Sequence, residues 1–396
     1  MSRRPLLRTV AAGILMSLVL TSLALVGVAA GAAAPAQAAA APSGSAALRG
    51  QEYVALGDSY AAGYGLGSLT GDPVSACGQS SRDYPHRVAS ALGARLTDVS
   101  CAGATTANVL DTKQDGAAPQ VDALSKRTKL VTLSIGGNDA GLFATAQKCI
   151  ALSATGPIFG ASAGATSCRS EFVKNGQDTL AHAIETTTAG DLATTFRAIE
   201  KRAPHATVVV VGYPAIFPDK AHTPVAGCYR PVVDAKSLVD GFPKDGFPFT
   251  STDVAYLSGV QATLDAVTAK AASAAGVTYV STLAASEAHS GCTTTGSYIA
   301  GITLDASEYF TSISLQTGAL HPNARGAAFL ASQTTAGISR ALAPTATPTP
   351  TSSATASHRP PELVWIALVA ALVAAFLTLL AANAGRRRRA RDRRRP

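Results

Sequence analysis

The chain has 396 residues, of which 47% are hydrophobic and 15% are charged, and its formal net charge is +8. This length fits one large domain or two small ones. The N-terminal segment contributes +3 and the C-terminal tail +7, which leaves −2 for the rest of the chain. Because the excess of arginine lies in segments that are typical of protein targeting, the charge does not indicate a nucleic-acid partner.

Residues 1–38 have the pattern of a secretory signal peptide. Arg3 and Arg4 precede a long apolar run, and an Ala-Gln-Ala sequence ends at Ala38. These are the basic region, the apolar region and the small-residue cleavage site of an export signal. A retained membrane anchor is the alternative, because the apolar run is long. Residues 39–46 are a low-complexity start of the mature chain.

Between the two ends, residues 47–343 are expected to form one folded domain in which strands alternate with helices. Short runs rich in β-forming residues predict five strands, in chain order at 53–56, 95–99, 130–135, 207–211 and 277–280. Longer helical patterns include 191–202, 253–275 and 322–342. The alternation predicts an α/β fold of three layers, with a central parallel sheet of about five strands between helices. In such folds, ligands bind beyond the carboxyl ends of the strands.

The C-terminal end predicts one membrane-spanning helix. Residues 344–361 are rich in Pro, Thr and Ser, which is typical of an extended stalk. Residues 363–382 are an uncharged apolar stretch of about twenty residues, enough to cross a bilayer core. An arginine-rich tail follows at 383–396 and favours a cytoplasmic C-terminus. We therefore expect a cell-membrane protein with a single span and an extracellular domain.

Residues able to take part in catalysis follow three of the predicted strands. Ser59 follows the first strand, Gly103 the second and Asn138 the third. A serine on a tight turn can present its hydroxyl to the ligand crevice, a glycine can offer its backbone N–H, and an asparagine carries an amide donor suited to an oxyanion. Each feature alone also fits an ordinary turn or helix cap. Together, at three strand ends in order, they indicate nucleophilic chemistry.

A nucleophilic serine needs a base, and His321 is the best placed of the seven histidines. It precedes Pro322 at the start of the last predicted helix, in a loop at the same edge of the sheet. By contrast, His182 and His205 lie in or beside helical stretches away from that edge. The sequence shows no cluster of metal ligands, and we expect neither a metal nor another cofactor.

In their order along the chain, these segments resemble the four blocks of the SGNH/GDSL hydrolases. Residues 53–60, Tyr-Val-Ala-Leu-Gly-Asp-Ser-Tyr, are similar to the family's nucleophile block, and Gly103 is similar to the glycine of the second block. Residues 136–139, Gly-Gly-Asn-Asp, resemble the third block, and 321–323, His-Pro-Asn, resemble the last. The resemblance spans about 270 residues, which makes it far more specific than any one block.

The resemblance implies a flavodoxin-like catalytic domain that hydrolyses carboxylic esters as an esterase or lipase. Ser59 would be the nucleophile and His321 the base. The backbone N–H groups of Ser59 and Gly103 and the amide of Asn138 would form the oxyanion hole. Lipid or acyl esters suit an enzyme tethered to a membrane, and we expect a monomer. Deacetylation of wall polysaccharide and a non-catalytic surface binding module on the same fold are the alternatives.

One position departs from the family's pattern. The family usually has Asp three residues before the histidine, where this chain has Gly318, and no carboxylate lies nearer upstream than Glu308. Some members of the secreted group orient the imidazole with a backbone carbonyl instead. We therefore expect a Ser–His dyad in which the carbonyl of Gly318 orients His321. A remote aspartate such as Asp305 is the alternative.

The six cysteines of this exported chain indicate disulfides, and their spacing alone leaves fifteen pairings open. None of them forms a C-x-x-C motif, so zinc or thioredoxin-like chemistry is not indicated. The sequence is similar to secreted actinobacterial esterases and lipases with three disulfides. That resemblance implies pairs between neighbours in the chain: Cys77–Cys101, Cys149–Cys168 and Cys228–Cys292.

Overall fold

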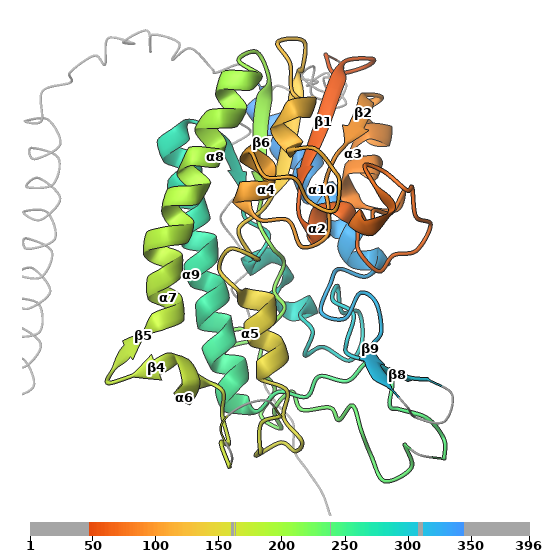
Figure 1. Cartoon of the computed structure of the whole chain (residues 1–396), viewed down its shortest axis with the longest axis vertical. Coiled ribbons are helices and arrows are strands. Elements are labelled where there is room, and N and C mark those ends of the chain that lie inside the picture. Colours follow the sequence, from red (N-terminus) through yellow and green to blue (C-terminus); the bar gives the residue numbers. More distant parts are fainter. Residues whose placement is uncertain (1–46, 160–161, 163, 238, 308–311, 344–396) are drawn as a thin grey trace, which may run out of the picture. The chain divides into compact units, whose positions relative to one another are not determined.

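The computed structural model describes residues 47–159, 162, 164–237, 239–307 and 312–343. A five-stranded parallel sheet forms the centre of the fold (Figure 1). Its strands are β1 (Glu52–Gly57), β2 (Arg95–Asp98), β3 (Leu130–Ser134), β6 (Thr207–Val211) and β7 (Thr278–Val280). Their spatial order is β2-β1-β3-β6-β7, so the direction of the chain along the sheet reverses between β1 and β3. All five strands that the sequence predicted are confirmed.

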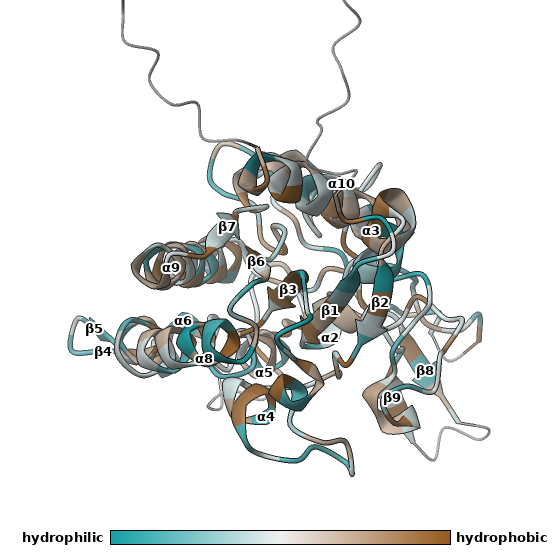
Figure 2. Cartoon of the chain, turned by 90° about the horizontal axis from the view of Figure 1, so that it is seen from above, coloured by the Kyte–Doolittle hydropathy of each residue, from teal (hydrophilic) through white to brown (hydrophobic). Residues whose placement is uncertain are grey.

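Helices cover both faces of the sheet (Figure 2). On one face, α3 (Tyr84–Leu92) and α10 (Ala324–Ala341) pack against each other. On the other face lie α4 (Thr106–Leu110) and α8 (Ala189–Arg202), and α9 (Ser251–Ala275) packs along α8 and β7. The expected three-layer, flavodoxin-like sandwich is therefore confirmed.

Shorter elements connect these layers. The further helices are α2 (Ser59–Ala62), α5 (Leu142–Lys148), α6 (Arg169–Phe172) and α7 (Thr179–Ala183), the 3₁₀ helices η1 (Ser75–Cys77), η2 (Gln120–Ala123) and η4 (Ala284–His289), and the π-helical turn η3 (Ile184–Thr188). Two small antiparallel sheets pair β4 (Val173–Lys174) with β5 (Gln177–Asp178), and β8 (Leu304–Ala306) with β9 (Ile313–Leu315).

The inner strands β1, β3 and β6 are almost wholly buried because helices cover both faces of the sheet. Val54 and Leu56 of β1 are fully buried in the same core as Phe196 of α8. On the opposite face, the hydroxyl of Tyr53 hydrogen-bonds to Thr132 of β3, 2.7 Å away. The inner strand β1 is thus fixed from both sides, which gives the residues at its carboxyl end a rigid support.

The three long helices predicted from sequence are present, and capping side chains set the start of two of them, α9 and α10. α9 begins at Ser251 because the side chain of Thr250 accepts a hydrogen bond from the Asp253 N–H. α10 begins at Ala324, two residues later than predicted, because Asn323 Oδ1 accepts from the N–H of Arg325 at 2.9 Å. The capping places Pro322 before the helix and leaves His321 in the preceding loop.

The cysteines form three disulfides, and these are the pairs that the family resemblance implied: Cys77–Cys101, Cys149–Cys168 and Cys228–Cys292. The expected signal peptide, mature N-terminus, stalk, membrane helix and arginine tail fall in 1–46 and 344–396, outside the described residues. Within the part of the chain that the structure describes, no helix combines the length and the apolar character needed to cross a bilayer.

Candidate active site

Ser59 lies where the carboxyl end of β1 turns into α2. Asp58 is the N-cap of this short helix, and its Oδ1 accepts from the Tyr60 N–H at 2.9 Å. Gly57 has a φ of +137°, and a Cβ there would lie 2.5 Å from the carbonyl oxygen of Ser134 on β3. The turn therefore requires glycine. This local sequence places Ser59 at the edge of the sheet, between the loops that follow β2 and β3.

His321 reaches Ser59 from the loop between β9 and α10. Its Nε2 lies 2.8 Å from Ser59 Oγ, and its Nδ1 lies 2.9 Å from the backbone carbonyl oxygen of Ala319. A carbonyl can only accept, so Nδ1 carries the proton and Nε2 is left as the acceptor of the Ser59 hydroxyl. The two residues are separated by 262 positions in the chain, and the fold brings them into direct contact.

The carbonyl that orients His321 is that of Ala319, and the expectation that Gly318 fills this role is wrong. The Gly318 carbonyl instead accepts from the backbone N–H of His321 at 3.0 Å. Leu320 has a φ of +61°, and this left-handed residue turns the chain so that the Ala319 carbonyl faces the ring. A side chain at Gly318 would meet Gly65, whose Cα would lie 2.9 Å from the added Cβ. The position of the usual acidic residue is therefore sterically closed.

The two aspartates considered for a third catalytic role lie elsewhere. Asp305 is exposed on β8. Asp139 accepts from the backbone N–H of Thr106 at 3.0 Å and from its hydroxyl at 2.5 Å, so it ties the end of β3 to α4. Across the described residues, no carboxylate is hydrogen-bonded to His321.

Gly103 and Asn138, which are expected to form the oxyanion hole together with Ser59, lie on either side of β1, as the strand order requires. Gly103 follows β2 and Asn138 follows β3. The side-chain amide of Asn138 donates to the carbonyl of Ala104 at 2.8 Å, which joins the two loops and leaves one amide proton available. In the described part of the chain, no acceptor is found for the backbone N–H of Ser59 or of Gly103.

A tyrosine that sequence reasoning missed connects the nucleophile turn to the Asn138 loop. The hydroxyl of Tyr213, in the loop after β6, donates to the buried carboxylate of Asp58. The same hydroxyl accepts from the Gly137 N–H at 2.9 Å. Burial raises the pKa of Asp58 to about 7, and the hydrogen bond from Tyr213 opposes this rise. The only sequence signal was the position of Tyr213 two residues after a predicted strand.

Aromatic rings surround the imidazole of His321. Phe143 stacks on it with ring centroids 5.3 Å apart, and the rings of Tyr60 and Tyr64 lie at 5.1 and 5.3 Å. The Tyr60 hydroxyl donates to the carbonyl of Leu320 at 2.6 Å and holds the histidine loop. Burial lowers the pKa of His321 to about 4, although the Ala319 carbonyl acts in the opposite direction. The ring is therefore neutral at pH 7 and free to accept a proton.

Comparisons with known proteins indicate the chemistry of this site. The chain matches the GDSL-like lipase/acylhydrolase family over residues 55–329. It is 37% identical to lipase 2 of Streptomyces coelicolor over 246 residues, which are 62% of this chain and 74% of that protein. It is 36% identical to a lipase of Streptomyces rimosus over 172 residues, which are 43% of this chain and 55% of that protein.

The fold has a counterpart among solved structures. The crystal structure of an extracellular lipase from Streptomyces rimosus aligns with a TM-score of 0.50 and 24% sequence identity. The alignment covers 74% of this chain and 100% of that chain. This similarity concerns the arrangement of the sheet and its covering helices.

Proposed function

The chain belongs to the GDSL-like lipase/acylhydrolase family and is a carboxylic ester hydrolase, and we propose that it cleaves acyl esters of lipids with Ser59 and His321 as a catalytic dyad. One observation carries the dyad: His321 Nε2 lies 2.8 Å from Ser59 Oγ while its Nδ1 is held by the Ala319 carbonyl. This is the geometry that a nucleophile and its oriented base require.

The reaction proceeds as acyl transfer to water. His321 Nε2 takes the hydroxyl proton while Ser59 Oγ attacks the ester carbonyl, and the resulting imidazolium gives the proton to the departing alcohol. A water molecule then enters, gives a proton to His321 and attacks the acyl-enzyme. The carboxylic acid leaves, and the proton returns to Ser59 Oγ. Without a carboxylate partner, the imidazolium is stabilised by the dipole of the Ala319 carbonyl and not by a full negative charge.

The oxyanion of each tetrahedral intermediate would be bound by the backbone N–H groups of Ser59 and Gly103 and by the free amide proton of Asn138. The support for this assignment is the placement of the three groups at neighbouring strand ends together with their unused donors. Loss of one such donor typically lowers kcat by about 10²- to 10³-fold.

Export and membrane attachment are part of the proposal. The signal-like N-terminus, the apolar stretch 363–382 and the arginines after it support an extracellular domain anchored by a C-terminal helix. Three disulfides and no free cysteine among the described residues agree with an oxidising compartment. A lipid substrate suits this location, and the rings of Tyr64 and Phe143 give the base an apolar border that suits an acyl chain.

The substrate class is tested by giving the full-length protein two ester substrates, one a lipid and one a polysaccharide. Release of fatty acid from phosphatidylcholine vesicles is compared with release of acetate from acetylated polysaccharide, with Ser59→Ala as the blank. The proposal expects Ser59-dependent fatty-acid release. Ser59-dependent acetate release without fatty acid would assign the enzyme to polysaccharide deacetylation instead.

A further inference from the structure

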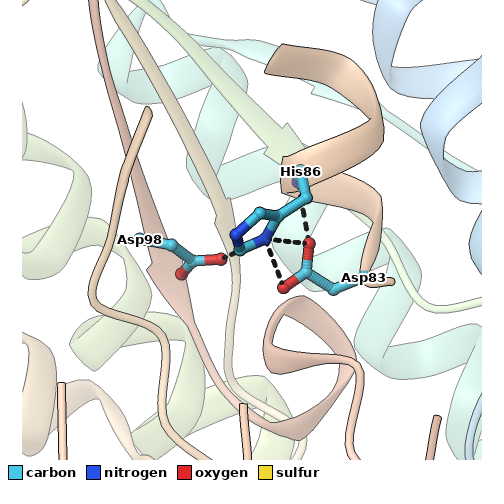
Figure 3. A group of neighbouring side chains, drawn as sticks. All are labelled: Asp83, His86 and Asp98. Carbon is cyan, nitrogen blue, oxygen red and sulfur yellow. Dashed lines mark hydrogen bonds and ion pairs between the residues drawn. The ribbon is translucent and has the colours of Figure 1, made fainter. Parts of the chain in front are cut away.

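A second group of titratable side chains lies on the face of the sheet covered by α3, apart from the Ser59 site (Figure 3). Asp83 caps the N-terminus of α3, His86 lies in its first turn, and Asp98 ends β2. His86 Nδ1 is 2.8 and 3.0 Å from the two carboxylate oxygens of Asp83 and 3.8 Å from Oδ2 of Asp98. Spacing along the chain did not reveal this group, because β2 brings Asp98 back beside α3.

The group is incomplete without a further partner. The side chain of Asp98 is only 3% exposed. Its Oδ1 accepts from the N–H and the hydroxyl of Ser100, at 2.9 and 2.6 Å, whereas the buried Oδ2 has no hydrogen-bond partner. This unpaired oxygen faces His86 across a gap too long for a hydrogen bond. A buried carboxylate oxygen without a partner is costly, so its retention needs an explanation.

The group holds more acidic side chains than its single basic side chain can pair. Two carboxylates, both almost fully buried, share one imidazole. A divalent cation would neutralise both carboxylates and satisfy the unpaired oxygen in one step.

We propose that Asp83, His86 and Asp98 bind one divalent transition-metal ion, for which Zn²⁺ is the best fit. Imidazole nitrogen and carboxylate oxygen are zinc ligands at about 2.0–2.2 Å, so that two ligands of a tetrahedral ion lie about 3.4 Å apart. The His86–Asp83 contact would lengthen by about 0.6 Å and the His86–Asp98 gap would close by about 0.4 Å to reach this spacing. With His86 32% exposed, water can fill the fourth position.

A bound ion would stabilise the support of the nucleophile. The chain just before Asp83 is hydrogen-bonded to α2, since Ser80 N–H donates to the carbonyl of Ala62 at 2.8 Å and the Ser80 carbonyl accepts from Asp83 N–H. The ion would join α3 to β2 next to this connection. The site is therefore structural, and it takes no part in the transfer of the acyl group.

A second histidine–carboxylate group offers a matched control. Asp219, His222 and Glu287 also lie close together, but His222 is exposed. Glu287 Oε2 already accepts from the Asp219 N–H at 2.8 Å, and no carboxylate oxygen of this group is among the buried unpaired atoms of the described residues. His222→Ala removes the same kind of ligand as His86→Ala from a group that lacks the decisive feature.

The test is a titration of untagged, full-length, chelator-treated protein with ZnCl₂, followed by calorimetry, metal analysis and thermal unfolding. We expect one Zn²⁺ per chain and a higher Tm with the ion. Asp98→Asn, which preserves shape, and His86→Ala should each weaken binding by about 100-fold or more, because a direct ligand is lost. His222→Ala should bind Zn²⁺ as the unaltered chain does. Zinc-free ester hydrolysis by each variant shows that it is folded.

Two results would overturn the proposal. One is the absence of stoichiometric binding to the unaltered chain. The other is binding that His86→Ala leaves unchanged or that His222→Ala abolishes. Should Asp98→Asn fail to fold, His86→Ala decides the outcome alone, since His86 is partly exposed and caps no helix.

Discussion

The imidazole of His321 is oriented by a neutral carbonyl, so its charge state depends on its surroundings more than on a partner. The aromatic rings of Tyr60, Tyr64 and Phe143 lie against it and leave it only partly exposed. The Ala319 carbonyl selects the tautomer and supplies only a dipole. Such a base is ready at neutral pH without the energetic cost of keeping a second charge buried.

This environment predicts how activity depends on pH. The base acts only when neutral, and burial lowers the pKa of His321 to about 4. kcat/KM on a soluble ester should therefore stay level as the pH falls from 8 to 5 and be halved near about pH 4. An inflection near about 6.5, the ordinary value for histidine, would contradict the assigned environment.

Asp58 requires a control in the same experiment, because its pKa is raised to about 7. The profile is measured again with Asp58→Asn, which retains an oxygen able to cap α2. An inflection near pH 7 that disappears in this variant belongs to Asp58 and not to His321.

Tyr213 is expected to matter for the geometry of the site. Tyr213→Phe leaves the Gly137 N–H and one Asp58 oxygen without their partner, which should lower the free energy of unfolding by about 1–3 kcal/mol. It should also lower kcat more than it changes KM, because the Asn138 loop loses an anchor. The control is Tyr256→Phe on α9, which removes a hydroxyl that donates to Asp178 of β5. Equal losses of kcat in both variants would show that Tyr213 has no specific role in positioning the site.

The sequence singled out the two side chains that meet in the candidate site, Ser59 and His321, but not the groups around them. Ser59 and His321 belong to distinctive segments in a fixed order. The carbonyl of Ala319, and not that of Gly318, faces the imidazole because Leu320 has a left-handed backbone. This conformation is uncommon for leucine, so the residue type at position 320 did not predict it. Tyr213 belongs to no motif, and only the packing of β6 beside β3 makes its role visible.

At the scale of elements, strand prediction succeeded because the inner strands β1, β3 and β6 are short runs of apolar and β-branched residues. The region between β3 and α8 was harder. There α5, α6 and α7 are short, and their sequence is rich in Ala, Gly and Ser. Short helices of this kind are held by tertiary contacts and a disulfide more than by their own periodicity. The loops and short helices could therefore not be derived in detail.

The disulfides allow a prediction at this scale. Cys77–Cys101 fixes the loop that carries Gly103, and the Ala102 N–H donates to the Cys77 carbonyl at 3.0 Å. Replacing both cysteines by alanine should cost about 3 kcal/mol of stability and should also lower kcat. Replacing Cys228 and Cys292, which close a longer loop of 64 residues, should cost about 4 kcal/mol with little loss of kcat. Urea unfolding and ester hydrolysis separate the two effects.

An outcome in which only the Cys228–Cys292 replacement lowers kcat would contradict the role given to the Gly103 loop. Loss of kcat in neither variant would mean that this loop is held by other contacts, such as the 2.7 Å hydrogen bond from Gln114 Nε2 to the Ala102 carbonyl.

At the scale of the whole molecule, the strand order explains why the candidate active site is at this edge. The loops after β2, β1 and β3 are neighbours because the chain direction reverses beside β1, as at the ligand sites of other doubly wound sheets. Gly103, Ser59 and Asn138 can therefore converge although they are far apart in sequence.

The proposed topology predicts that the catalytic domain is accessible from outside the cell. Protease added to intact cells should release or degrade the domain and leave the arginine-rich tail protected. A chain that ends after residue 343 should appear in the medium, since it lacks the proposed anchor. Complete protection of the domain in intact cells, with cleavage only after lysis, would show that it is not exported.

The central claim is that Ser59 and His321 act without a catalytic carboxylate. It is tested most directly by comparing kcat/KM of Asp305→Asn and His321→Ala on p-nitrophenyl butyrate, with folding verified by circular dichroism. Asp305 is exposed and makes no contact with the imidazole in the described structure, so Asp305→Asn should retain activity within about twofold, whereas His321→Ala should lose nearly all of it, by about 10⁴-fold or more. Equal, near-complete loss in both folded variants would mean that Asp305 completes a triad.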